Sequence, residues 1–387
     1  MFTVYHSNQL EVQKDILVEL IQRQPLSNPL QPETVLVQSP GMAQWLQLQI
    51  AEQKGIAANF AFPMPASFIW QLYAENLPDV AQSNQFNKNA MMWRLMRLIP
   101  QYLEQEAFHP LRHYLVHSVQ SEQFKLYQLA GKIADLFDQY LVYRPDWIAA
   151  WEAHQEADIH HQIEAQSNFN NDRLSAQIEQ NIAWQASLWR ALVQAVKTET
   201  GLELVQHRAH LHQLLLEKLR KNRPLFLPER LFIFGIPALP KAYLEIFQAI
   251  SQYCDVHLFF NNPCQEYWGD IVDSTFVAKL ALRTRTDYFN QANKPLLSAE
   301  QIAQAEQQWE VTYAQEKLQV GNPLLASWGK LGRDFSYLLT QLEPNEISAY
   351  AEIEPKNLLS QIQHQILHLI PSGSDRLAEA SRDLDVD

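Results

Sequence analysis

Two β-type runs, each followed by a turn and an amphipathic helix, lie far apart in this chain. The first run, Thr34–Val37, leads into helical spacing over 42–51. The second, Arg230–Phe234, leads into helical spacing over 241–250 and then into a further β-type run at Val256–Phe260. Strand–helix–strand order is typical of parallel sheets whose strands are joined by crossover helices. The sequence therefore predicts an α/β fold.

Helical periodicity dominates the rest of the chain and fills the stretch from about 85 to 225 between the two units. We expect helices at Leu10–Ile21, Asn89–Ile99, Glu122–Tyr143, Asn181–Val196, Leu211–Leu219 and Leu324–Leu342, and a further strand at Phe2–Tyr5. This order predicts an α/β core over 1–84 and 226–345 that is split by a helical insertion over 85–225. Residues 346–387 are expected to form a connecting helix and a linker.

Three polar stretches interrupt the pattern. Residues 155–175 are rich in Gln, Asn, His and Asp, which predicts a loop or a poorly ordered segment. A second weakly patterned stretch runs from 295 to 316, and the polar tail after Pro371 is expected to fray.

Composition limits the kind of protein this can be. Only 2 Cys occur, too few for a disulfide framework, and no leader peptide or long apolar stretch is visible. We therefore expect a soluble, cytoplasmic protein that does not enter membranes. The formal net charge of −13 argues against a protein that coats nucleic acid in general, but it leaves room for a local basic channel.

The first strand–turn–helix junction lacks the groups that bind nucleotide phosphates. A phosphate-binding loop needs G-x-x-x-x-G-K-[ST], whereas Gln38–Trp45 reads Q-S-P-G-M-A-Q-W, with one Gly and no Lys. The second strand runs into Gly235 without a carboxylate that could hold Mg²⁺. We expect no ATPase site, no catalytic residue and no bound cofactor.

Histidines form two groups that could suggest a metal. They are His109, His113 and His117 at i, i+4 and i+8, and the cluster His207, His210 and His212. Pro110 interrupts the first group, and no nearby carboxylate pairs with it. A structural or solvated role is therefore expected, and no metal site is predicted.

The helix expected over 122–143 carries polar groups on one face. Asp135, Asp138 and Gln139 are spaced i, i+3 and i+4, and Arg144 follows at the end. They could form a solvated face neutralised by Arg144. They could also read DNA, because carboxylates accept from cytosine and Gln and Arg address purine edges. An acid/base pair is a third interpretation, but no further group supports it.

Two further blocks combine aromatic, Pro and Gly residues. Phe62–Trp70 is either a packed loop with Ser67 as helix N-cap or a platform on which a base stacks on Trp70. In the block over 320–334, Asn322 before Pro323 indicates a helix start. Gly329 and Gly332 then indicate close approach of another element, because Gly inside a helix costs about 1 kcal/mol relative to Ala.

Taken together, these blocks resemble the RecC family, the gamma chains of exodeoxyribonuclease V. The matching segments are 4–8, 35–39, 41–46, 55–59, 62–70, 134–147, 262–270 and 321–334. The likeness extends to about residue 365, is poor over 150–180, and corresponds to the N-terminal third of a RecC chain.

The resemblance implies a superfamily 1 helicase-like fold that has lost its ATPase motifs. It also implies a heterotrimer with RecB and RecD that binds single-stranded and double-stranded DNA ends in double-strand break repair. RecC guides the unwound 3′-ended strand and recognises the G-rich Chi octamer in it. The alternative is a purely structural scaffold for RecB and RecD assembly.

Carried over position by position, the resemblance assigns Chi recognition to Gln38, Gln44, Met64, Trp70, Asp135, Leu136, Asp138, Gln139, Arg144 and Arg208. Pro40 stands where the family pattern commonly has Thr, which removes a hydroxyl beside Gln38. Met64 replaces a Leu conservatively. Both departures leave open which octamer this protein reads.

Overall fold

The computed structural model describes residues 1–77, 80, 85–116, 121–167, 172–201, 207–269, 271 and 322–370. The chain divides into two compact units. The α/β unit comprises Met1–Pro65, Pro228–Leu239 and Ser251–Asp387. The helical unit comprises Ala66–Leu227 and Pro240–Ile250. The predicted stretches at 295–316 and after Pro371 lie outside the described residues.

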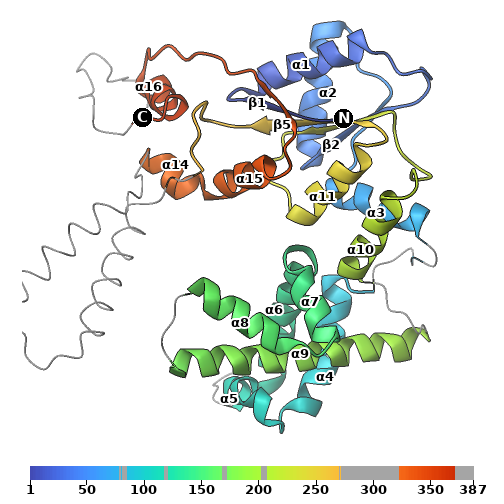
Figure 1. Ribbon diagram of the computed structural model, residues 1–387, viewed down its shortest axis with the longest axis vertical. Helices are drawn as coiled ribbons and strands as arrows, with labels where there is room; N and C mark the ends of the chain where they lie inside the picture. Colours follow the sequence, from blue (N-terminus) through green and yellow to red (C-terminus); the bar gives the residue numbers. More distant parts are fainter. Residues whose placement is uncertain are drawn as a thin grey trace, which may run out of the picture. The chain divides into compact units, whose positions relative to one another are not determined.

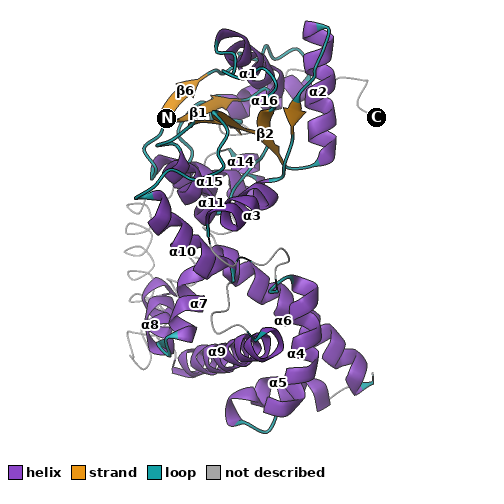
Figure 2. Cartoon of the chain, turned by 90° about the vertical axis from the view of Figure 1, so that its right-hand side faces the viewer, coloured by secondary structure: helices purple, strands orange, loops and turns teal. Residues whose placement is uncertain are grey.

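A parallel sheet forms the centre of the α/β unit (Figures 1 and 2). Its strands are β1 (Phe2–Ser7), β2 (Glu33–Val37), β3 (Phe60–Ala61), β4 (Arg230–Phe234), β5 (Asp255–Asn261) and β6 (Asn345–Ser348). Their order is β3-β2-β4-β5-β1-β6, and every described pairing is parallel. The α/β prediction is therefore confirmed. The two edge strands were not predicted, because β3 is two residues long and β6 is exposed throughout.

The two faces of the sheet are covered by different helices of the same unit. Helices α1 (Leu10–Arg23) and α2 (Pro40–Lys54) lie beside the sheet (Figure 1). Their Leu17 and Leu46 side chains are buried in one core on one face of the sheet. They pack on alternate strand residues, as the two-residue period of a strand requires. On the other face, Phe260 meets Phe335 edge-on with ring centroids 5.2 Å apart.

A buried ion pair joins the amino ends of the neighbouring strands β2 and β4. Arg230 donates from both Nε and Nη2 to the carboxylate of Glu33, and the Nε–Oε2 distance is 2.9 Å. Both residues are buried. The same guanidinium donates to the Leu20 and Gln24 carbonyls at the end of α1. The Arg230 side chain therefore links β4 to both β2 and the end of α1.

The C-terminal part of this unit contains α14 (Pro323–Trp328), α15 (Lys330–Thr340) and α16 (Leu358–Leu367). The Asn322 side chain caps α14, as predicted. The single helix predicted over 324–342 is wrong, because it is interrupted at Gly329. A Cβ at Gly329 would lie 2.9 Å from the Trp268 ring, so the prediction of close approach is confirmed.

The helical unit contains no strand among its described residues (Figure 2). Its elements are α3 (Pro65–Asn76), α4 (Lys88–Tyr102), the short 3-10 helix η1 (Glu106–Phe108), α5 (His109–Val116), α6 (Glu122–Tyr143), α7 (Pro145–Glu152), α8 (Glu156–Ser167), α9 (Asp172–Thr200), α10 (Arg208–Leu219) and α11 (Lys241–Ile250). Its core is built around Phe137, Trp151 and Trp189, with Phe137 edge-on to both indoles. Among the described residues no helix combines the length and apolarity that a bilayer crossing requires.

Two local predictions in this unit are corrected. Residues 156–167 form α8 instead of a loop, because Ile159 is buried and the Glu156 carboxylate pairs with Arg190 of α9. These tertiary contacts stabilise a helix in a segment whose polar composition by itself predicts a loop. Ser67 is not an N-cap, because α3 already begins at Pro65. The first boundary between the two compact units falls at Pro65, and both α3 and α11 belong to the helical unit. The predicted α/β core, 1–84 and 226–345, included both helices.

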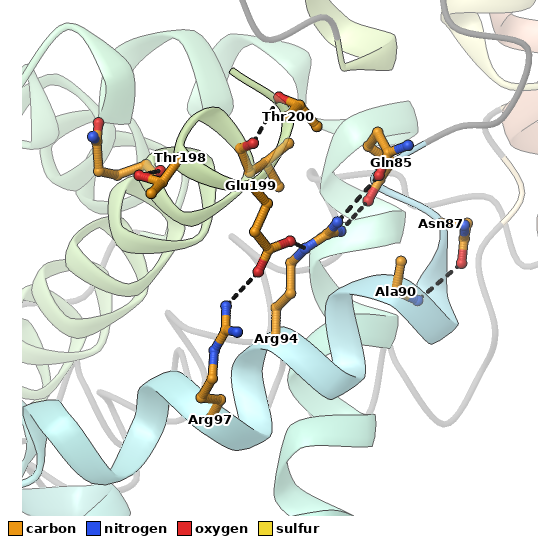
Figure 3. Close-up of polar contacts among 10 residues, drawn as sticks. Gln85, Asn87, Ala90, Arg94, Arg97, Thr198, Glu199 and Thr200 are labelled. Carbon is orange, nitrogen blue, oxygen red and sulfur yellow. Dashed lines mark hydrogen bonds and ion pairs between the residues drawn. The ribbon is translucent and has the colours of Figure 1, made fainter. Parts of the chain in front are cut away.

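A charged clamp holds the end of α9 against α4 (Figure 3). Glu199 accepts from Arg94 Nε at 2.7 Å and also pairs with Arg97. Arg94 in turn donates to the carbonyl and side chain of Gln85. The hydrogen bond from Arg94, followed by that from Arg97, holds the pKa of Glu199 below its usual range. This carboxylate therefore stabilises the folded state only while it is ionised.

We expect Glu199→Gln to lower the free energy of unfolding by roughly 0.5–1 kcal/mol at neutral pH, because solvent screens this partly exposed pair. Since the folded pKa is depressed, the difference between the two proteins persists above the unfolded glutamate pKa of about 4.3 and is lost as pH falls further. Urea unfolding from pH 7 to 3 measures this. A difference that grows toward acid would contradict the clamp.

Candidate nucleic-acid interface

Three of the predicted recognition residues lie in the α/β unit. Gln38 directly follows β2, Met64 closely follows β3, and Gln44 lies in the second turn of α2. All three are exposed, Met64 by 49%. The Val37 amide donates to the Pro63 carbonyl at 3.3 Å, which joins the ends of β2 and β3. Gln38 and Met64 thus stand at the carboxyl edge of a parallel sheet, where such folds bind ligands.

Side chains fill the junction between β2 and α2 at this edge. Ser39 caps α2 through a bond from the Met42 amide to its Oγ at 3.3 Å. The Met42 side chain lies over Gly235, where an added Cβ would be 2.8 Å from Met42 Cε. Gly235 has φ +64°, a conformation that disfavours other residues. Trp45 stacks on Phe234 at 6.2 Å between ring centroids. The thioether of Met42 and the indole of Trp45, both on α2, thus pack against the end of β4.

The remaining predicted residues lie in the helical unit, most of them on α6. Asp135 accepts from Lys88 Nζ at 2.6 Å, and this hydrogen bond holds the pKa of the Asp135 carboxyl below its usual range. Leu136 is half-buried, and Gln139 is exposed. Arg144 is exposed at the end of α6, with its guanidinium 5.1 Å from the centre of the Trp147 ring. Asp135 and Arg144 thus interact with different neighbours.

Asp138 is linked to α10 by Arg208. Arg208 Nη1 lies 3.4 Å from Asp138 Oδ1, at the long end of hydrogen-bond distances. The two side chains are 30% and 34% exposed. Such a long, half-exposed pair contributes little to stability, so either group can exchange its partner at low cost.

Trp70 and Arg208 line the same small recess of the helical unit. The recess also has Tyr73 of α3 and Tyr243 of α11 in its wall, and its volume is about 20 Å³. Trp70 and Tyr73 are edge-on, with ring centroids 6.1 Å apart. The volume admits about one water molecule, so the recess is no pocket for a whole base. A base could stack only on its rim.

Both tyrosines of the recess remain hydrogen-bond donors. Burial raises the pKa of Tyr73, and burial also raises the pKa of Tyr243. The positive charge of Arg208 lowers the pKa of both tyrosines and so opposes the effect of burial, whereas the negative charge of Asp138 further raises the pKa of Tyr243. The recess therefore presents neutral phenols beside the guanidinium of Arg208, which pairs with Asp138.

The structure thus brings together Trp70, Asp138 and Arg208, and it adds partners that the sequence had not indicated. Tyr73 lies one turn after Trp70, and this i, i+3 spacing on a helix was an available signal. Lys88 and Tyr243 are 47 and 105 residues from Asp135 and Asp138 in the sequence. No local spacing connects residues so distant.

Two histidines of the second group, His207 and His212, have carboxylate partners. His207 Nε2 lies 2.8 Å from Glu152 Oε1, and His212 Nε2 lies 2.8 Å from Glu245 Oε2. Both histidines are buried. Each forms a hydrogen bond that joins two helices, so both histidines have a structural role. His117 lies outside the described residues.

Comparison with known proteins settles the family. The model of the family described as "RecC, N-terminal domain" matches residues 2–369. The chain belongs to the RecC family. It is 57% identical over 378 residues to the RecBCD enzyme subunit RecC of Haemophilus influenzae, covering 95% of this chain and 33% of that one. It is 45% identical to RecC of Escherichia coli K12, covering 95% and 31%. This RecC-family chain therefore spans about a third of the length of these curated relatives.

The Met42–Gly235 contact can be tested against a matched glycine. Gly55 also has a positive φ, but its added Cβ would meet nothing within 4 Å. We expect Gly55→Ala to cost about 1–2 kcal/mol of unfolding free energy from backbone strain alone. Gly235→Ala should cost roughly 1 kcal/mol more, because Met42 must move.

Adding Met42→Ala should remove the excess at Gly235 and leave the effect at Gly55 unchanged. Urea unfolding of the single and double variants gives the coupling energy. Equal costs for the two glycines would show that Met42 does not fill the junction.

Proposed function

We propose that this protein is a non-catalytic DNA-binding subunit that acts with RecB and RecD in a RecBCD helicase/nuclease during double-strand break repair. The family membership supports this, since the relatives are named RecBCD enzyme subunit RecC. In this proposal the α/β unit is an inactivated superfamily 1 helicase-like core. The helical unit is its insertion, and the chain guides the unwound 3′-ended strand.

The observation that carries the DNA-reading role is the grouping of Trp70, Asp138 and Arg208 in the helical unit. An indole, a carboxylate and a guanidinium are the side chains that bind unpaired bases: the first by stacking, the others through base edges. In the structure the Asp138 carboxylate and the Arg208 guanidinium are paired through a contact of 3.4 Å. They are therefore held in position while remaining able to exchange partners.

The chemistry suits a G-rich single strand such as the Chi octamer. An ionised carboxylate accepts from two N–H groups at once, which an unpaired guanine presents on its Watson–Crick edge. Arg208, released from Asp138, can donate to guanine O6 and N7 or to a phosphate. The exposed Gln139 and Arg144 on the same helix, and Gln38, Gln44 and Met64 in the α/β unit, complete the proposed recognition set.

We expect Asp138→Ala and Arg144→Ala, each made in the complex with RecB and RecD, to leave assembly intact and to weaken the response to Chi. Loss of one base-edge contact costs about 1–3 kcal/mol, so the Chi-dependent change in DNA cleavage should fall about tenfold or more. Asp158→Ala and Arg112→Ala are matched controls, because both side chains belong to the helical unit and neither lines the recess. They should respond like the unmodified complex.

Co-purification of the three subunits and cleavage of duplexes with and without Chi measure both effects. If Asp138→Ala prevents assembly, the polar face is a contact with a partner subunit. That result would favour the alternative scaffold role. One observation supports the alternative: Trp93 of α4 is 60% exposed, with its ring 6.1 Å from that of the exposed Tyr127. Large exposed aromatics are enriched at protein interfaces.

We further propose that this chain does not hydrolyse nucleotide itself. The short turn at Gln38 and Ser39, the Ser39 cap and the Met42 side chain over Gly235 support this. Gln38–Trp45 contains no lysine to bind phosphate, and no carboxylate directly follows Arg230–Phe234 to bind Mg²⁺.

A fluorescent ATP analogue with Mg²⁺ should therefore show no saturable binding to the purified chain at about 1 mM, a concentration at which ATPases are typically occupied. Fluorescence anisotropy measures this. Saturable binding that excess unlabelled ATP displaces would contradict the proposal.

A further inference from the structure

Two histidines and a glutamate converge at the C-terminal end of the α/β unit, far along the chain from the recess. His364 and His368 lie one turn apart on α16, and Glu352 lies in the extended segment that follows β6. Within the ranges that the structure describes, this is the one group of three His, Cys, Asp or Glu side chains close enough to share a metal ion.

Their geometry brings one donor atom of each residue together. The three donor atoms lie within 4.8 Å of one another. Glu352 Oε1 is 2.7 Å from His368 Nε2 and 3.6 Å from His364 Nδ1. The two imidazole centroids are 4.4 Å apart. By contrast, the equally spaced pair His109 and His113 on α5 has ring centroids 6.3 Å apart.

Neighbouring groups orient both imidazoles. His364 Nδ1, the ring nitrogen that faces Glu352, also lies 3.0 Å from the Ile353 carbonyl, and this contact orients the ring. His368 Nδ1 lies 2.8 Å from the amide of Gln265, which can present its oxygen after a simple flip and then hold a proton on this Nδ1. Metal-binding histidines characteristically donate their second ring nitrogen to a carbonyl or amide oxygen, and His368 has this arrangement once the Gln265 amide is flipped.

The donor set identifies the class of metal. Two imidazole nitrogens and one carboxylate oxygen form a set that Zn²⁺ accepts, with a fourth position open to water. Glu352 is 66% exposed, and the two histidines are 24–29% exposed, so an ion can enter from solvent. Glu352 also borders a cavity of about 590 Å³ that Gln9, Glu354 and Lys356 help to line.

We propose that Glu352, His364 and His368 form a Zn²⁺ site. The ion would join α16 to the segment after β6, whose Ala351 amide and carbonyl already bond to the Asn8 side chain. Zn²⁺ would therefore fix the C-terminal part of this unit on its sheet. The site is independent of the proposed DNA-reading residues.

The test uses the full chain without a histidine tag and two probes, Zn²⁺ alone and Co²⁺ alone. Isothermal titration calorimetry should give one Zn²⁺ per chain, and Co²⁺ should give the intense visible absorption of a four-coordinate site. Zn²⁺ should also raise the unfolding temperature, because an ion that binds only the folded state stabilises it.

The variants separate the site from general binding to histidines. His364→Ala and His368→Ala should abolish the Co²⁺ spectrum, and Glu352→Gln should weaken Zn²⁺ binding about tenfold or more. His109→Ala is the matched control and should bind as the unmodified chain does. His364→Gln keeps most of the side-chain volume and serves if the alanine variant fails to fold, and circular dichroism of each variant checks folding.

Three results would overturn the proposal. They are the absence of saturable Zn²⁺ binding, unchanged binding in the folded variants of both His364 and His368, and equal loss of binding in His109→Ala. The last result would place the ion on other histidines.

Discussion

The buried ion pair between Arg230 and Glu33 is the contact on which the α/β unit depends. The two residues are 197 positions apart, with the helical unit's main segment between them in the sequence. Because they stand opposite one another where β4 and β2 begin, the pair brings the two halves of the sheet together and sets their register. Removing one partner of such a pair leaves a buried charge, which typically costs about 3–5 kcal/mol.

The opposite edge of the same strands determines what the fold can do. At their carboxyl ends, where parallel α/β folds usually bind ligands, Met42 and Trp45 pack against Gly235 and Phe234. Hydrophobic contacts there strengthen the packing of α2 on the sheet. Side chains therefore fill the junction between β2 and α2. This fits the proposal of a guiding and reading role.

The candidate interface was partly predictable from the sequence. The i, i+3, i+4 spacing of Asp135, Asp138 and Gln139 places them on one face of α6, and helix geometry alone guarantees this. Their partners were not predictable, because Lys88, Arg208 and Tyr243 come from three other helices. The same limit applies to the zinc-type cluster, in which Glu352 lies outside the helix that carries both histidines.

The sequence alone determined the features that depend on neighbours along the chain. The four longer strands follow from short apolar β-type runs, α1 and α6 from helical periodicity, and the start of α14 from Asn322 and Pro323. Tertiary structure alone decided the strand order, the folding of the polar stretch over 156–167 into α8, and the pairing of Asp138 with Arg208. Each of these rests on contacts between residues distant in sequence, whose energies no local pattern contains.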